Sequence, residues 1–301
     1  MTKLYTTAPT TIFGPPGTGK TTTLINIVQE KLLDGVRPEE IGFMSFSRKA
    51  ATEAKERASK ILDLNPKDMV YFRTLHSLAF SWLGLSTSEV MSGRDYNELG
   101  KLVGLDFRTT QTVNMEEGAL FNIGAGGDKY MSLIQYARVK KVDLEEEFHK
   151  GWDQSLNKQQ LLVLDKAFKD YKRANRKVDF IDMIERFIWQ ETSPEFDLLI
   201  IDEAQDLAPL QWQMVQDVLV PNSNEIVYAG DDDQAIYSWM GVDVENFLNA
   251  SSDKIILDQS FRVPKHPFAF AKGLTDQITK REDKEWKPKE EKGFVTWHNN
   301  I

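Results

Sequence analysis

One stretch near the N-terminus constrains the fold of this chain more than any other, because it demands a strand before it and a helix after it. Residues 14–22 read Gly-Pro-Pro-Gly-Thr-Gly-Lys-Thr-Thr. A short β-type run precedes them (10–13), and a helical pattern follows (24–33). A strand, a G-x-x-x-x-G-K-T loop and a helix in this order are typical of a phosphate-binding loop. A Gly/Pro turn that matches by chance is the alternative, and both flanking elements argue against it.

This loop predicts a nucleoside triphosphate as the ligand. Backbone N–H groups of the loop and the N-terminus of the helix can surround phosphate oxygens. Lys20 can reach the β- and γ-phosphates, and the Thr21 hydroxyl can ligate Mg²⁺. The expected nucleotide-binding residues are Gly14, Pro15, Pro16, Gly17, Thr18, Gly19, Lys20, Thr21 and Thr22.

The composition is that of an ordinary globular protein and excludes several other classes. The 301 residues suffice for about two domains. The chain has no cysteine and only four scattered histidines, which excludes disulfides and gives no zinc pattern. No apolar run approaches the roughly twenty residues that span a bilayer, and no signal peptide is visible. We therefore expect a cytoplasmic protein without membrane contact. The net charge of −9 argues against nucleic acid unless basic groups cluster locally.

Strand and helix patterns alternate on both sides of a long helical stretch. Residues 84–178 show helix-period segments and no convincing strand. Elsewhere the alternation predicts an α/β fold, with parallel strands and helices on both faces of the sheet. A helix is expected from Pro264 to about Lys280, then a charged linker (281–292) and a strand from Gly293 to His298. The other expected strands are 10–13, 41–47, 69–74, 195–202, 225–230 and 254–258.

Two acids end one of these apolar strands. Asp202 could bind the metal and its water shell, and Glu203 could act as the general base. Ligands of an open parallel sheet lie beyond the carboxyl ends of its strands, where the phosphate loop also lies. An Asp-Glu helix cap is the alternative. Gly230 and three aspartates follow the next strand, and Gln234 after them could contact the γ-phosphate; a solvated Asp turn explains this run equally well.

Seven segments stand in the order of the helicase motifs of superfamily 1, and the chain resembles the UvrD/Rep/PcrA branch. They are the phosphate loop and residues 43–51, 73–77, 179–183, 201–206, 230–239 and 257–262. The resemblance implies an ATP- and Mg²⁺-dependent DNA helicase that moves 3′ to 5′ on single strands and separates duplexes. It also implies two RecA-like domains, the first with a helical insert. The expected division is 1–83 and 179–262 for the first domain, 84–178 for the insert and 263–301 for the start of the second.

The resemblance also assigns roles to single residues. Gln234 would contact the γ-phosphate, Arg262 would be an arginine finger, and Phe261 would pack near the nucleotide base. Aromatic residues would stack on bases, while Thr74 and His76 would lie along the sugar-phosphate backbone. From the residues alone, Phe46 is also compatible with a core position, and the basic groups with solvated helix faces. The expected DNA-binding residues are Phe46, Arg48, Lys49, Thr74, His76, Tyr237 and Trp239.

The chain departs from the family pattern in three places. Residues 1–13 lack the glutamine element that selects ATP, and Met240 stands where the family has arginine. The motifs of the second RecA-like domain are absent, so we expect the front part of a longer motor. Alone, this chain should bind nucleotide, hydrolyse it poorly and unwind nothing, because Arg262 would lack the body of the second domain. The rival functions are an ATPase that remodels nucleoprotein without unwinding and a binding fragment without turnover.

Overall fold

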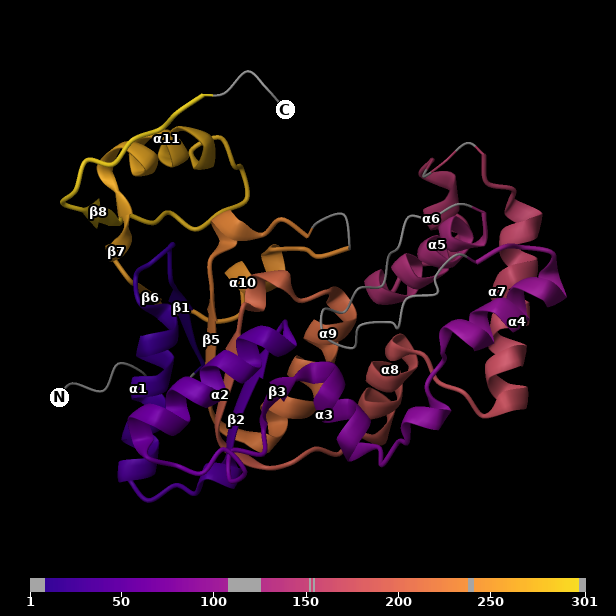
Figure 1. Cartoon of the computed structure of the whole chain (residues 1–301), viewed down its shortest axis with the longest axis horizontal. Coiled ribbons are helices and arrows are strands. Elements are labelled where there is room, and N and C mark those ends of the chain that lie inside the picture. Colours follow the sequence, from indigo (N-terminus) through magenta and orange to yellow (C-terminus); the bar gives the residue numbers. More distant parts are fainter. Residues whose placement is uncertain (1–8, 108–125, 152, 154, 238–240, 298–301) are drawn as a thin grey trace.

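The computed structural model describes residues 9–107, 126–151, 153, 155–237 and 241–297. A six-stranded sheet forms its centre, with every pair of neighbouring strands parallel and the order β3-β2-β4-β5-β1-β6 (Figure 1). The six strands predicted for this sheet are confirmed, with shifted ends. They are β1 (Thr10–Phe13), β2 (Ile41–Ser45), β3 (Phe72–Thr74), β4 (Phe196–Asp202), β5 (Ser223–Gly230) and β6 (Asp253–Ile256).

Helices cover both faces of the sheet. Alternate strand residues point to opposite sides, and on the central strands the residues of both sides are apolar and need cover. Leu198 and Ile200 belong to the core on one face, together with α1 (Lys20–Leu33) and α2 (Arg48–Leu62). Leu199 and Ile201 belong to the core on the other. The helices of that second face are α3 (Leu75–Trp82), α8 (Phe180–Gln190), α9 (Pro209–Gln213), which continues as a π-helical turn (Met214–Leu219), and α10 (Glu245–Leu248).

The described part of residues 84–178 is helical and has a core of its own. Leu99, Leu133 and Leu164 are fully buried in this separate cluster. Its one β-type contact among the described residues is a bridge between Val90 and Val178, where the chain leaves and returns. These features support the proposed insert at 84–178. Its helices are α4 (Gly93–Val103), α5 (Gly127–Lys140), α6 (Leu144–His149) and α7 (Lys158–Asn175).

A buried ion network joins this helical stretch to the start of α8. Lys172 Nζ lies 2.6 Å from Asp179 Oδ2 and 2.7 Å from Asp182 Oδ2. Arg138 of α5 bonds to Asp179 at 2.7 Å. Burial by itself would raise the pKa of Asp179, but the charges of Arg138 and Lys172 more than offset it and hold that pKa below its usual value. Lys172 therefore belongs to an internal network rather than to a solvated basic face.

The C-terminal part corrects three predictions. The helix expected to reach Lys280 is α11 (Lys265–Thr275), which ends at Thr275. The chain after it turns toward Asp233, with which Arg281 forms an ion pair. The expected linker contains β8 (Lys287–Lys289), which pairs in parallel with β7 (Gln259–Pro264) in a second sheet. Described residues 293–297 form no strand: Gly293 turns the chain at a φ of 61°, after the N–H of His266 has bonded to the Lys292 carbonyl at 2.8 Å.

The chain passes from the six-stranded sheet to the two-stranded sheet between β6 and β7. This change falls a few residues before the expected domain boundary at 262, and the exact boundary stays a prediction. In the part of the chain that the structure describes, no helix combines the length and the apolar character needed to cross a membrane.

Candidate nucleotide site and nucleic-acid face

The predicted phosphate loop joins the ends of β1 and β5. The N–H of Gly14 donates to the Gly230 carbonyl at 2.8 Å. The loop also closes on itself, because the Thr18 N–H and hydroxyl both donate to the Pro15 carbonyl, at 3.1 and 2.8 Å. Gly19 caps α1 with a left-handed φ of 86°. The first N–H groups of α1, which have no acceptor within the helix, therefore open at the loop, as an anion site requires.

Lys20 and the two acids of the predicted site lie together. Lys20 Nζ is 2.8 Å from Asp202 Oδ1 and 2.7 Å from Glu203 Oε1. Burial alone would lower the pKa of Lys20, but the two carboxylates outweigh it and raise that pKa. Burial alone would raise the pKa of Glu203, yet the Lys20 charge and hydrogen bond leave it lowered. Glu203 is therefore ionised at neutral pH, as a general base must be.

Asp202 has the opposite behaviour. Burial, assisted by the charge of Glu203, raises its pKa despite the neighbouring Lys20. A divalent cation would favour the ionised carboxylate, so this donor set fits Mg²⁺. Among the described residues no three His, Cys, Asp or Glu side chains form a metal cluster. Magnesium commonly takes one or two protein ligands together with nucleotide phosphates, and Asp202 with Thr21 would be those ligands.

Lys20→Ala should weaken binding of a Mg·ATP analogue by about 1.5–3 kcal/mol, the range of a charge-assisted contact. The loss has two causes: the phosphates lose a cation, and Asp202 and Glu203 face them without a neutralising partner. Calorimetric titration measures the affinity, with Lys60→Ala on the exposed side of α2 as the control. Equal affinities for the Lys20 variant and the unchanged chain would contradict this assignment.

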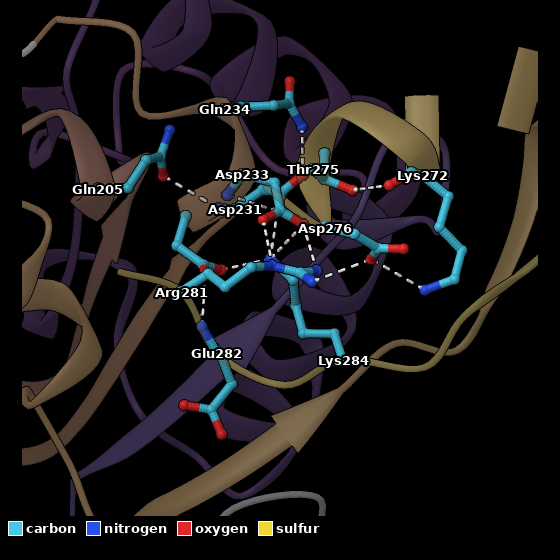
Figure 2. Close-up of polar contacts among 11 residues, drawn as sticks. Gln205, Asp231, Asp233, Gln234, Lys272, Thr275, Asp276, Arg281, Glu282 and Lys284 are labelled. Atoms are coloured by element: carbon cyan, nitrogen blue, oxygen red, sulfur yellow. Dashed lines mark hydrogen bonds and ion pairs between the residues drawn. The ribbon is translucent and has the colours of Figure 1, made fainter. Parts of the chain in front are cut away.

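Gln205 connects three parts of the site, and the sequence assigned it no role. Its Nε2 donates to Glu203 Oε2 at 3.0 Å and to Asp206 Oδ2 at 3.1 Å. Its Oε1 accepts from the N–H of Asp231 at 3.1 Å, as Figure 2 shows. Gly230 leaves space for this amide, because a Cβ there would collide with it. Membership of the segment 201–206 is the only sequence signal for Gln205.

The three aspartates after Gly230 form a buried ion cluster, which corrects the interpretation as a solvated turn (Figure 2). Lys284 Nζ lies 2.8 Å from Asp231 Oδ1 and 3.1 Å from Asp233 Oδ2, and it also bonds to Asp232. Burial alone would lower the pKa of Lys284, but the aspartates raise it. Arg281 binds Asp233 at 2.8 Å. Both cations come from the segment predicted to be a linker, so sequence patterns missed them.

Lys284→Met should destabilise the fold by about 3–5 kcal/mol, because it leaves buried carboxylates without their cation. The Lys284 side chain is 0% exposed. Lys280→Met is the matched control, since its exposed pair with Glu245 at 2.7 Å should contribute only about 0–1 kcal/mol. Urea denaturation of both variants gives the free energies of unfolding. Similar losses in the two variants would show that the cluster has no special weight.

The backbone before Arg262 is held on the phosphate loop. The Ser260 hydroxyl donates to the Pro16 carbonyl at 2.7 Å, and the N–H of Phe261 donates to the Gly17 carbonyl at 2.9 Å. A Cβ on Gly17 would collide with Arg262 Cβ. The backbone next to Arg262 is therefore held on the loop, while the placement of its side chain at the γ-phosphate stays a prediction. Its guanidinium is exposed and forms no ion pair with any described residue.

The other two predicted contacts near the nucleotide are also exposed. The Phe261 ring lies on the surface, so its place beside the base stays a prediction. Gln234 is tethered, because its Nε2 donates to Asp231 Oδ2 at 2.6 Å. The amide is therefore held at the strand-end edge from which a γ-phosphate contact would be made.

The predicted DNA residues fall into different environments. Phe46 is half-buried against the core, with its ring centroid 5.3 Å from that of Tyr237, and its contact with a base stays a prediction. Thr74 is buried, and its hydroxyl accepts from the Ser77 N–H at 3.2 Å as the cap of α3. Burial lowers the pKa of His76 to about 4, so the ring is neutral at pH 7. Arg48 and Lys49 are exposed on the first turn of α2, and Trp239 and Met240 lie outside the described residues.

A phosphate loop at the end of β1, acids at the ends of the neighbouring strands and an all-parallel sheet define a P-loop NTPase fold. The chain belongs to the UvrD/REP helicase N-terminal domain family, whose sequence model matches residues 2–255.

Similar curated proteins cover nearly the whole chain at low identity. It is 26% identical to the ATP-dependent DNA helicase PcrA of Bacillus subtilis, over 93% of this chain and 39% of that protein. It is 23% identical to the ATP-dependent DNA helicase Rep of Buchnera aphidicola, over 86% of this chain and 39% of that protein. The chain thus spans about two fifths of the length of these relatives.

Proposed function

We propose that this chain is the nucleotide-hydrolysing core of an ATP-dependent DNA helicase or translocase that moves 3′ to 5′ on single-stranded DNA. One observation carries the proposal: Asp202, Ser45 and Thr74 are register partners at the ends of β4, β2 and β3. Adjacent strands lie about 4.8 Å apart, so Asp202 is about 10 Å from Thr74, one of the residues proposed to lie along DNA. ATP turnover and strand contact would thus share one sheet edge.

The roles of the residues in hydrolysis follow from their positions. The phosphate loop and Lys20 would hold the triphosphate, and Asp202 with Thr21 would hold Mg²⁺. Glu203, ionised and hydrogen-bonded to Gln205, would accept the proton of the attacking water. Arg262 would neutralise charge that develops on the transferred phosphoryl group, and Gln234 would contact that group. Bound Mg·ATP supplies the scissile phosphate and the charge of the metal.

A second RecA-like domain is the proposed intramolecular partner. Phe270 and Leu274 are exposed on α11, and Phe294, which follows β8 in the sequence, is also exposed. α11 has no buried residue in the structure. An apolar surface of this kind is expected where further protein packs.

The test is ATP turnover by the purified chain, with and without oligothymidylate, together with strand displacement from 3′-tailed and 5′-tailed duplexes. Stimulation by the oligonucleotide, with any displacement confined to the 3′-tailed duplex, supports the proposal. Stimulation without displacement, repeated in a longer form that contains the second domain, would favour an ATPase that remodels nucleoprotein. Nucleotide binding without turnover would identify a binding fragment.

Trp239→Ala should weaken single-strand binding by about 1–3 kcal/mol regardless of base sequence, if the indole is a stacking platform. Fluorescence anisotropy with homopolymeric oligonucleotides measures this, and Trp239→Phe, which keeps a stacking ring, is the control. Lys49→Ala should instead reduce the salt dependence of binding, because a phosphate contact releases counterions. A Trp239→Ala variant that loses stability but keeps its DNA affinity would show that the indole belongs to the core.

A further inference from the structure

A buried carboxylate oxygen without a hydrogen-bond partner lies next to the proposed general base. It is Oδ1 of Asp206, a residue that is only 7% exposed. The other oxygen, Oδ2, accepts from Gln205 Nε2 at 3.1 Å. Among the residues that the structure describes, Oδ1 has no donor. Buried polar groups are rarely unpaired, so an orphan acceptor indicates a position that a further donor completes.

Asp206 also lines a small cavity that reaches the proposed DNA face. Phe46 and His76, both predicted to contact DNA, line the same cavity, and Val139 of α5 lines it from the helical stretch. Its volume is about 20 Å³, which is enough for a single water molecule. The lining is mostly apolar and His76 is neutral, and Asp206 and Gln211 are the other polar side chains that line the cavity. The cavity thus has room for one donor beneath the surface proposed to hold the strand.

Gln205 links this carboxylate to the chemistry. The same Nε2 that bonds to Asp206 bonds to Glu203 Oε2 at 3.0 Å. The Oε1 end of the amide is held by the Asp231 N–H and lies against Gly230, so Nε2 stays between the two carboxyls. Because Nε2 donates to both, a change at Asp206 is expected to alter the hydrogen bond that Gln205 makes to Glu203.

We propose that Asp206 is a positioning residue that couples occupancy of the DNA face to the orientation of Glu203. A strand lying over Phe46 and His76 closes the cavity and traps one water, which donates to Asp206 Oδ1. The fixed carboxylate then holds Gln205, and Gln205 holds Glu203 where it can accept a proton from the attacking water. This inference rests on the proposed function, because it requires that single-stranded DNA binds this face.

The test compares Asp206→Asn with the unchanged chain. The amide conserves the shape and can keep an acceptor for Gln205, but it places a donor in the cavity where Oδ1 was an acceptor. Asp217→Asn, an exposed position on the π-helical turn, is the matched control. Four readouts are taken: the ratio of ATP turnover with and without oligothymidylate, oligothymidylate affinity, thermal stability, and the side-chain amide NMR signal of Gln205. This signal is assigned by its loss in Gln205→Leu.

We expect Asp206→Asn to reduce the stimulation ratio by about tenfold or more, which is within the usual range of coupling between two sites. If the ratio of the unchanged chain is itself below about tenfold, we expect Asp206→Asn to abolish the stimulation. Oligothymidylate affinity and thermal stability should stay close to those of the control. The Gln205 signal should shift with oligothymidylate in the unchanged chain and not in Asp206→Asn. This signal decides the question even where turnover is slow.

Two results would overturn the coupling role. One is an Asp206→Asn variant that is stimulated like the unchanged chain. The other is a Gln205 signal that stays fixed while oligothymidylate binds. A parallel loss of stability, affinity and both turnover rates would reduce Asp206 to a structural residue. If the unchanged chain fails to bind oligothymidylate, the proposed function fails first, and the coupling fails with it.

Discussion

Replacing Glu203 with glutamine is expected to lower ATP hydrolysis by at least about a hundredfold, the usual scale for losing a general base. Glutamine can orient a water molecule but cannot take its proton. Nucleotide binding should persist, because Lys20 keeps Asp202 as a partner and the phosphate loop is untouched. Single-turnover hydrolysis with the chain in excess over ATP measures the rate, and titration with a Mg·ATP analogue measures the affinity.

Glu191→Gln is a suitable control, because Glu191 is an exposed glutamate with the same left-handed φ of 54° as Glu203. Its substitution should leave both quantities unchanged. Hydrolysis by the Glu203 variant at nearly the native rate would mean that another group accepts the proton. Asp206 would then be the first residue to examine, since its buried carboxyl bonds to the same Gln205 amide as residue 203.

The second large effect is expected at Arg262. Arg262→Ala should reduce the single-turnover rate by roughly 10³–10⁵, the range found for arginine fingers in phosphoryl transfer. The structure supports this because Ser260 and Phe261 tie the adjacent backbone to the carbonyls of Pro16 and Gly17. Binding of the Mg·ATP analogue should change much less, since the developing charge exists only during the reaction.

Arg262→Lys tests the geometry of this contact. Lysine keeps the charge but loses the planar fork of donors, so an intermediate rate is expected. A loss of less than about tenfold in Arg262→Ala, far below the range for a finger, would show that the guanidinium does not reach the γ-phosphate in this chain. A cation from elsewhere in a longer protein would then have to supply the effect.

The fold and the positions of the phosphate loop, Asp202 and Glu203 were largely predictable because their signals are local. The central strands β2, β4 and β5 contain apolar runs, and chemistry-bearing residues stand at or just after strand ends, as Asp202 does at the end of β4. Parallel strands bring such ends to one edge, so sequence order alone implies proximity. The pairing of Lys20 with both acids was not predicted, because the loop pattern describes the cation only in relation to phosphates.

The parts that could not be predicted depend on contacts between distant segments. Lys284 stands in a charged, proline-containing run that is typical of a linker, and only its position against Asp231 makes it a buried cation. Gln205 was recognisable as part of a motif, whereas its three hydrogen bonds require coordinates. The strand predicted from Gly293 failed for the converse reason: its residues are β-type, but a strand also needs a neighbour to pair with.

Gly17 and Arg262 are far apart in the sequence, yet the backbone of Gly17 lies directly against the Arg262 side chain. Any side chain on Gly17 would have to take the space of Arg262 Cβ and would also adopt a φ of 75°. The absence of a side chain at Gly17 therefore leaves room for the Arg262 segment as well as for phosphates at the loop. A substitution at Gly17 would thus displace the Arg262 segment, and grafting the loop into another scaffold would require transferring both segments.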